Sequence, residues 1–449
     1  MRLARLRSFR HGVHPDGHKT TADVPTRRMP FVERYVLPLG QHIGAPAKPV
    51  VSVGQHVARG EMIAAPGAFV STALHAPVAG RIAAIAERRD PTGRLANAIE
   101  IEADPFSTQA MPTPRAVDAD ALTDDEFVAL VQHGGLVGLG GAAFPSHVKY
   151  APTEGKPVEW LVLNGAECEP FLTADHRLML ERPQDVVRGA TILAKRLSAG
   201  GIKIGVELNK GDAVQALRDA AAEALAAGEA PIPIEVVGLQ VKYPQGAEKM
   251  LIKAIFEREV PAGKLPLDIG IVVNNVGTIA ALADLVDRGW PLIERIVTVA
   301  GPGIGEPSNL IVPIGTPVSA VIRHCHVRGE TRELIMGGPM MGQPLASSDV
   351  PVVKGTSGLL AFTEAELTKR HEYTCVRCGR CLDACANMLN PARLARLARA
   401  RRYDELEASF VTDCMECGAC SYTCPSGLPI VQLIRAAKAA VRTRKKDKN

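Results

Sequence analysis

The spacing of the cysteines constrains the fold of this chain more than any other feature. The stretch CVRCGRCLDAC at residues 375–385 returns as CMECGACSYTC at residues 414–424, so most of the 10 cysteines follow one pattern twice. In a reducing compartment, clustered thiols are more often metal ligands or redox groups than partners in structural disulfides. The two runs therefore predict a small metal-binding module towards the end of the chain.

Each run reads C-x2-C-x2-C-x3-C, the spacing that holds [4Fe–4S] clusters in bacterial two-cluster ferredoxins. Three close thiolates wrap one face of a cubane, and the fourth cysteine of each run reaches the other cluster. Zinc also binds four thiolates, but its sites usually pair two C-x2-C hooks. Pro425 follows the second run and Ala386 the first, a difference that affects backbone stiffness rather than the ligands. The predicted ligand sets are Cys375, Cys378, Cys381 and Cys424 for one cluster, and Cys414, Cys417, Cys420 and Cys385 for the other.

The segment between the two runs is expected to be a helix with one apolar face. Leu394, Leu397, Tyr403, Leu406 and Phe410 recur mostly in steps of three or four. The arginines opposite them form either a solvated face or a docking surface for an acidic partner or anionic lipid. The basic end of the chain, VRTRKKDKN, is expected to be a disordered tail.

Length and composition exclude several classes of protein. A chain of 449 residues is too long for one core, so three or more domains are expected. The small formal net charge of +4 and the aromatic content of 4% argue against nucleic acid as the main partner. No apolar run approaches the roughly 20 residues of a spanning helix, and the basic start lacks the apolar core of a signal peptide. A cytoplasmic protein is expected.

Four turns in the middle of the chain contain glycine or asparagine. LVGLGGAAFPSHVK, residues 136–149, is a glycine loop before a helix expected after Pro145, and amides at such a helix start suit phosphate. VEWLVLNGAECEP and GIVVNNVGTIAAL each read as an apolar strand with polar side chains at its carboxyl end, where α/β sheets bind ligands. YPQGAEKMLIKAIF, residues 243–256, is a glycine turn that opens a helix. Any one of these could be an ordinary strand-to-helix turn, but four together predict a binding site.

The same four turns carry a resemblance to a known family. GLGGAAFP, NGAECEP, YPQGAEK and NNVGT occur in this order, with small changes, in the NADH- and FMN-binding subunit of respiratory complex I. Over its full length, from the opening GVHPDGHK to the two cysteine runs, the chain resembles still more closely the C subunit of the Rnf electron-transport complexes. The resemblance implies two [4Fe–4S] clusters, FMN as a cofactor and NAD(H) as a substrate.

The resemblance also implies roles for individual residues, by their position in the motifs. Phe144 matches the aromatic residue that stacks on the adenine of the dinucleotide, and Glu167 and Glu169 match acids around the nicotinamide and the flavin. Ala166 and Ala247 stand where the complex I subunit has Asp and Glu, which bears on the choice between NADH and NADPH. The other implied cofactor-binding residues are Gly138, Gly140, Gly141, Lys149, Asn164, Gly246, Glu248, Asn274, Asn275 and Thr278.

The expected fold is an α/β multidomain protein. A Rossmann-like FMN/NADH domain is accompanied by barrel-sandwich, β-grasp and α-helical two-cluster ferredoxin domains. The HAPVAG turn lacks the lysine that biotinyl and lipoyl carrier domains modify, so no attached cofactor is expected in the barrel-sandwich. The predicted boundaries are an N-terminal segment at 1–37, the barrel-sandwich at 38–105, the FMN/NADH domain at 115–290, the β-grasp domain at 291–350, the ferredoxin domain at 365–435 and the basic tail at 436–449.

The resemblance implies the NAD-facing arm of a membrane-bound, ion-translocating ferredoxin:NAD oxidoreductase, peripheral at the cytoplasmic face of the inner membrane. The implied partners are integral-membrane and iron–sulfur subunits of the same complex, NADH and, indirectly, ferredoxin, with no nucleic acid. One alternative is a soluble flavin and iron–sulfur reductase, such as the cobalamin reductases of propanediol utilisation. The other is a ferredoxin-like scaffold whose glycine motifs are only structural.

Overall fold

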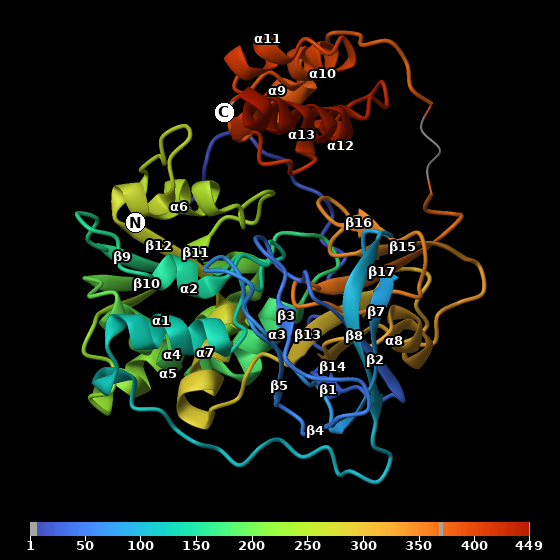
Figure 1. The fold of residues 1–449 in the computed structure, drawn as a ribbon. Helices are drawn as coiled ribbons and strands as arrows, with labels where there is room; N and C mark the ends of the chain where they lie inside the picture. The colour runs from blue at the N-terminus through green and yellow to red at the C-terminus, as the bar shows by residue number, and fades with distance from the viewer. Residues whose placement is uncertain (1–6, 368–370, 449) are drawn as a thin grey trace.

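Two small antiparallel sheets form the N-terminal part of the structure, a computed structural model that describes residues 7–367 and 371–448 (Figure 1). The inward side chains of both sheets, among them Tyr35, Ile63 and Ile82, are fully buried in a shared core. The short strands separated by glycine turns are confirmed. In sheet order they are β2 (Arg34–Pro38), β8 (Leu95–Ala103), β7 (Gly80–Arg89) and β4 (His56–Val57), then β3 (Lys48–Pro49), β5 (Met62–Ala65) and β6 (Leu74–His75).

A four-stranded parallel sheet forms the centre of the chain, which we call the central unit (residues 124–288). Its inner strand β9 (Trp160–Gly165) and the strand β12 (Ile271–Asn275) are mostly apolar runs with side chains buried on both faces, as is typical of parallel sheets. The predicted strands in WLVLNG and IVVNN and the predicted helix with Glu248 in its first turn are confirmed. The strand order is β11 (Ile234–Leu239), β10 (Gly201–Glu207), β9 and β12.

Helices cover both faces of this sheet. On one face lie α4 (Pro183–Arg196), α5 (Gly211–Ala226) and α7 (Val276–Arg288), whose apolar residues share a core with those of the strands. On the other face lies α6 (Glu248–Phe256). The remaining helices are α1 (Asp124–His133), α2 (Ser146–Tyr150), which begins after Pro145 as predicted, and α3 (Ala174–Glu181).

A second, mixed sheet of six strands adjoins the central unit. It takes β1 and β17 from outside residues 291–350, so the sheet is assembled from distant parts of the chain. Its core is aliphatic and is closed by the short helix α8 (Val318–His324). The strand order is β1 (Arg27–Arg28), β14 (Ser308–Pro313), β13 (Glu294–Ala300), β17 (Gly358–Thr363), β15 (Thr331–Met336) and β16 (Gln343–Pro344).

The cysteine module (residues 371–448) is helical and stands at one end of the molecule, red in Figure 1. The single helix predicted between the two runs is wrong. The chain forms two helices there, separated by residues 400–402, where Arg401 has a φ of +54°. Phe410 is exposed rather than part of the apolar face, because it also adopts a positive φ at the end of the second helix. The helices of the module are α9 (Arg380–Ala384), α10 (Pro391–Arg399), α11 (Tyr403–Ala408), α12 (Ala419–Tyr422) and α13 (Ile430–Lys448).

The disordered tail predicted at the end of the chain is also wrong as far as the structure describes it. Residues 436–448 continue α13, and Ala437 and Val441 bury their side chains against the other helices of the module. The apolar positions thus extend the helix beyond the point where basic residues become frequent. Within residues 7–367 and 371–448, no helix combines the length and apolar character that crossing a membrane demands.

The N-terminal residues 9–19, which we call the strap, lie between the central unit and the cysteine module. Val13 exchanges backbone hydrogen bonds with Tyr243 in the turn before α6. Phe9 shares an apolar cluster with Ala386, just after the first cysteine run, and Val13 shares one with Ala384, within that run. The beginning of the chain therefore helps to fasten its last module to the central unit.

Lys354 joins the barrel-sandwich to the central unit. Its side chain is 1% exposed, and its Nζ donates to the carbonyl oxygens of Ala73 at 2.7 Å and Gly135 at 2.6 Å. A third bond, of 3.3 Å, reaches Thr72 Oγ1. A buried ammonium is tolerated only where such acceptors surround it.

Replacing Lys354 with Met should lower the free energy of unfolding by about 2–4 kcal/mol, because two buried carbonyls lose their donor. Chemical denaturation followed by circular dichroism measures the loss. Lys48→Met, at an exposed position of β3, is the matched control and should change stability by less than about 0.5 kcal/mol. Equal stability of the Lys354 variant and the parent would contradict the proposed joining role.

Candidate functional site

The carboxyl ends of β9 and β12 bring two of the motifs side by side, and the glycine loop lies against them. Asn275 is paired with Asn164 across the two strands. A side chain added at Gly140 would meet Asn275 at 3.6 Å, so the loop backbone lies directly over that residue. The Leu139 amide donates to Thr278 Oγ1 at 2.9 Å. Thr278 is fully buried, and its hydroxyl holds the loop in place.

The turn before α6 is fastened to the same edge by Asn164. The Asn164 amide nitrogen donates to the Gly246 carbonyl at 2.8 Å, while its Oδ1 accepts from the Ala166 amide at 3.1 Å. The Gly246 amide in turn donates to Cys168 Sγ at 3.3 Å. A Cβ at Gly246 would overlap the Ala166 carbonyl, so only glycine fits at this close approach.

Two further predicted residues form an ion pair at this edge. Lys149 Nζ lies 3.1 Å from Glu248 Oε1 and donates to the Val273 carbonyl at 2.9 Å. Asn274, next along β12, accepts from the Tyr150 hydroxyl at 2.9 Å. Gly138, Gly141 and Phe144 belong to the loop itself, where the Gly138 amide donates to the Phe144 carbonyl at 2.8 Å. The four motifs therefore meet at one edge of the parallel sheet.

The structure separates the carboxylates of Glu167 and Glu169, although both stand in one motif. Glu167 accepts from the backbone amides of Asp175 at 3.0 Å and His176 at 3.3 Å, so it caps the start of α3. Glu169 instead accepts from the amides of Met340 and Met341, in the loop between β15 and β16. Burial raises the pKa of Glu169 above its ordinary value. The loop thus joins two different parts of the molecule.

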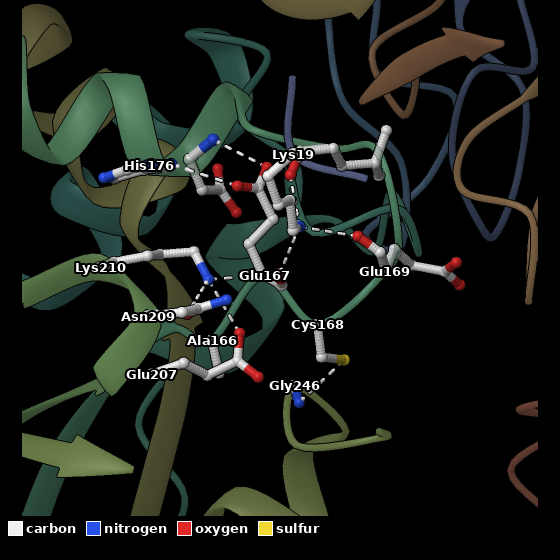
Figure 2. A network of polar contacts seen from close by, with 12 residues as sticks. Lys19, Ala166, Glu167, Cys168, Glu169, His176, Glu207, Asn209, Lys210 and Gly246 are labelled. Atoms are coloured by element: carbon white, nitrogen blue, oxygen red, sulfur yellow. Dashed lines mark hydrogen bonds and ion pairs between the residues drawn. The ribbon is translucent and has the colours of Figure 1, made fainter. Parts of the chain in front are cut away.

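Two lysines donate hydrogen bonds to the backbone of this loop (Figure 2). Lys19, the last residue of GVHPDGHK, donates to the carbonyls of Glu167 at 2.9 Å, Glu169 at 2.7 Å and Leu172. Burial of the ammonium lowers the pKa of Lys19. Lys210, 2% exposed, pairs with Glu207 at 2.8 Å and approaches the Glu167 carbonyl. The opening motif therefore fixes the backbone of the candidate site, a role that its sequence alone did not indicate.

Gln245 is a candidate that the sequence analysis did not name. It is completely buried, and neither its Nε2 nor its Oε1 has a hydrogen-bond partner among the described residues. Asn274 Nδ2 is also buried and has no hydrogen-bond partner among the described residues. Buried polar atoms without partners are rare in proteins and often mark a ligand or water position. An amide that both donates and accepts suits the polar edge of a flavin ring, so these residues fit the implied FMN.

The eight cysteines of the two runs line two cavities. The outer cavity is lined by Cys375, Cys378, Cys381 and Cys424, and the inner cavity by Cys385, Cys414, Cys417 and Cys420. This grouping matches the crossed ligand sets that the spacing predicts. In the described ranges, no three or more His, Cys, Asp or Glu side chains are arranged to hold a single metal ion. Four thiols around a cavity fit a cubane, whose ligands approach from separate sides.

The inner cavity adjoins the central unit. The Tyr243 hydroxyl donates to the Cys417 carbonyl at 2.6 Å, and lies 3.5 Å from Glu169 Oε1. Tyr243 is 1% exposed, and it packs with Val13, Ala419 and Met340 in one apolar cluster. A loop that carries predicted cluster ligands is thus held against the turn that carries Gln245.

Three family models match the chain. They are the Nuo51 FMN-binding domain over residues 131–284, the RnfC barrel sandwich hybrid domain over residues 7–105 and the 4Fe-4S dicluster domain over residues 372–428. The predicted barrel-sandwich, the FMN domain and the iron–sulfur module are therefore confirmed as domains.

Curated relatives are similar over most of their length. The C subunit of the proton-translocating ferredoxin:NAD(+) oxidoreductase complex of Clostridium ljungdahlii is 42% identical over 90% of this chain and 87% of the relative. The C subunit of the Na(+)-translocating complex of Acetobacterium woodii is 41% identical over 97% of each chain. A solved NAD+-reducing [NiFe]-hydrogenase in the H2-reduced state shares the fold alone, with a TM-score of 0.52 at 19% identity over 75% of this chain and 68% of that one.

The crossed ligand sets predict which cluster each cysteine substitution damages. Cys385→Ser should remove the inner cluster and about half of the iron, although Cys385 belongs to the first run. Cys381→Ser is the matched control, because it lies in the same run and should remove the outer cluster. Iron analysis and electron paramagnetic resonance of the anaerobically purified variants measure both losses. Loss of the same signal from both variants would contradict the crossed arrangement.

The buried carboxyl of Asp175 predicts a pH dependence of stability. Burial and the neighbouring Glu167 charge raise the pKa of Asp175. The folded state then binds its proton more tightly than the unfolded state, whose pKa is about 3.9. The protonated carboxyl of Asp175 therefore adds to the free energy of unfolding. This contribution is complete below about pH 4 and is lost as the pH rises through the raised pKa.

Asp175→Asn keeps an acceptor for the Asn275 amide, which donates to Asp175 Oδ2 at 2.7 Å. The variant should be more stable than the parent at pH 8, by about 1 kcal/mol, and the difference should shrink towards pH 5. Thermal unfolding across this range measures the effect. The exposed Asp349→Asn variant should follow the parent, and parallel curves for the parent and the Asp175 variant would refute the prediction.

Proposed function

The chain belongs to the family of the C subunit of the Rnf electron-transport complexes, and from this premise we propose how its residues carry electrons between NAD(H) and the rest of the complex. It is an electron-transfer subunit of an ion-translocating ferredoxin:NAD oxidoreductase, with an FMN-binding domain and a 4Fe-4S domain. Its relatives are subunits of complexes, so other subunits accompany it.

The order of the redox groups follows from their chemistry. Hydride carries two electrons, whereas a [4Fe–4S] cluster accepts one at a time, and a flavin handles both. FMN therefore belongs between NAD(H) and the clusters. The observation that carries this arrangement is the hydrogen bond of 2.6 Å from Tyr243 to the Cys417 carbonyl, because it fastens the inner cysteine loop to the unit with the FMN motifs.

We assign FMN to the edge of the parallel sheet formed by the glycine loop, β9 and β12. Gln245 and Asn274 supply amide groups without other partners, and Asn164, Asn275 and Thr278 fix the backbone around them. Lys149 places a positive charge at this edge of the sheet, and its ion pair with Glu248 partly neutralises that charge. Phe144 would stack on the dinucleotide. When bound, FMN supplies the exchange between hydride and single electrons, and the chain's residues bind it and exclude water.

Glu167 and Glu169 act in this proposal by holding the loop rather than by touching hydride. Their carboxylates are occupied by backbone amides at the start of α3 and at Met340 and Met341. Glu167 fixes the position of α3, and Glu169 fixes the approach of the loop towards Tyr243. Both effects position the inner cysteine loop and the flavin edge relative to each other.

The finer assignments of the fold and the location extend the same proposal. The parallel sheet is Rossmann-like, and residues 291–350, completed by β1 and β17, form the β-grasp domain of the family. The subunit binds at the cytoplasmic face of the inner membrane, where integral-membrane and iron–sulfur subunits of the complex receive or supply its electrons. The absence of an Asp at Ala166 and of a second Glu at Ala247 leaves fewer charges to oppose a ribose phosphate, so NADPH should also be tested as donor.

Stopped-flow reduction of the flavin by NADH, with flavin content measured on the same samples, tests the proposal. Gln245→Leu should lose most of its FMN because a buried amide no longer bonds the flavin. Phe144→Ala should keep FMN but bind NADH about tenfold more weakly, since a stacking face is removed. Gln215→Leu, at an exposed position of α5, is the control for the first variant. The proposal fails if the parent binds FMN and NADH does not reduce it.

A further inference from the structure

The two cysteine cavities have different surroundings. Around the inner cavity, Cys417 and Gly418 contact Tyr243 and the Met340 carbonyl of the six-stranded sheet. Both cavities are lined by the cysteine module alone, but within the described part of the chain no hydrogen bond or ion pair joins the lining of the outer cavity to another unit. Cys378 is exposed, whereas Cys420 in the inner cavity is buried. The outer cavity therefore stands at the free end of the module.

Large apolar side chains are exposed at the rim of the outer cavity. Val376 is 66% exposed and Leu382 is 41% exposed, and both line the cavity. Tyr373, 64% exposed, stands beside them in the chain. Exposed apolar groups gathered around a concave site are typical of a surface that a partner covers.

The same rim is basic. Arg377 and Arg396 line the outer cavity, and Arg380 follows at the start of α9. All three are exposed, and none has an ion-pair partner within the described part of the chain. By contrast, Arg399 and Arg402 nearby are paired with Glu372 and Glu405. The cavity lining contains no carboxylate. We call the exposed residues 376, 377, 380, 382 and 396 the outer rim.

We propose that the outer rim docks an acidic electron-transfer protein, a subunit of the same complex, and that electrons leave or enter through the cluster of the outer set. The inference rests on the proposed function. Cys375, Cys378, Cys381 and Cys424 would hold this cluster. Once bound, it would exchange single electrons with the partner's redox centre, one group being oxidised as the other is reduced, with no bond or proton exchanged. Arginines around an apolar centre attract an acidic surface and orient it over the cluster.

A protein fits these observations better than a lipid surface. The arginines surround a cavity that contains four thiols, so that whatever covers them lies close to the cluster. A redox protein gains from that proximity, whereas a lipid headgroup would cover the cluster without accepting its electron. The apolar side chains also stand at the mouth of the cavity, where a complementary protein surface can bury them.

Rebinding to stripped membranes tests the proposal. Membranes that carry the other subunits are washed free of this one, and the purified chain with its cofactors is added back over a range of salt concentrations. The double variant Arg377→Glu/Arg396→Glu should bind at least about tenfold more weakly than the parent at low salt. The parent's own affinity should fall as salt is raised. The matched control, Arg94→Glu/Arg323→Glu, changes the same charge at exposed positions elsewhere and should bind like the parent.

Two measurements separate this inference from the proposed function. NADH should reduce the FMN and the inner cluster of the charge-reversed variant at the parent's rate, with the parent's iron content, because the rim lies outside the flavin site and the inner cavity. If NADH does not reduce the parent, the proposed function fails regardless of binding. Vesicles of phosphatidylglycerol without protein test whether lipid alone binds the outer rim. They should bind the parent more weakly than the stripped membranes do.

Three outcomes would overturn the docking surface. The charge-reversed variant could rebind with the parent's affinity. The control could lose as much affinity as the variant, which would indicate a general effect of net charge. The lipid vesicles could bind the parent as tightly as the stripped membranes do, and release it on charge reversal, which would make the rim a lipid-binding surface instead.

Discussion

The three bonds of the Lys19 ammonium hold together the part of the structure on which the site depends. A cation removed from water requires acceptors, and the carbonyls of Glu167, Glu169 and Leu172 supply them. These carbonyls belong to one loop at the end of β9, so their common donor fixes its course. The loop in turn directs the carboxylate of Glu167 to α3 and that of Glu169 to the six-stranded sheet. The Lys19 ammonium thus determines, through the loop backbone, where the carboxylates of Glu167 and Glu169 point.

The contacts of this loop reach every major unit except the barrel-sandwich. His18 stacks on Phe171 at 4.9 Å between ring centroids, which joins the strap to the loop. Tyr243 lies between Glu169 and the cysteine module, and is too buried for water to replace its bonds. Because these contacts share residues, their contributions to stability are coupled and are not expected to add. The distance between the flavin edge and the inner cysteine loop is therefore under the control of a continuous polar network.

Local features of the fold could be predicted from the sequence, and non-local ones could not. The strand that ends at Asn275 is followed by a helix because an asparagine accepts the amides of Gly277 and Thr278, a pattern written in adjacent residues. The grouping of the eight thiols likewise follows from spacing. The break at Arg401 has no such signal, since a non-glycine residue with positive φ is set by packing.

The site shows the same division. The motifs identified the sheet edge. They could not show that Glu167, predicted to lie near the nicotinamide, also caps a helix, because its partner amides come from a segment whose approach only the fold determines. Gln245 could not be predicted from the sequence, because it stands out only by its buried amide without a hydrogen-bond partner. That property can be seen only when the positions of all its neighbours are known. Lys19 could be recognised as part of a motif, but not as the donor to a loop about 150 residues later.

The strap has a consequence for how the protein is made. Residues 9–19 leave the ribosome long before the residues with which they pack, since Phe9 clusters with Ala386, and Val13 with Ala384 and Ala419. At roughly 5–20 residues per second, tens of seconds pass between the two. During that interval only the central unit can cover the apolar side chains of the strap. Before residue 243 has been made, Tyr243 cannot cover them either. The apolar side chains of the strap are therefore covered completely only once the cysteine module has been made and has folded.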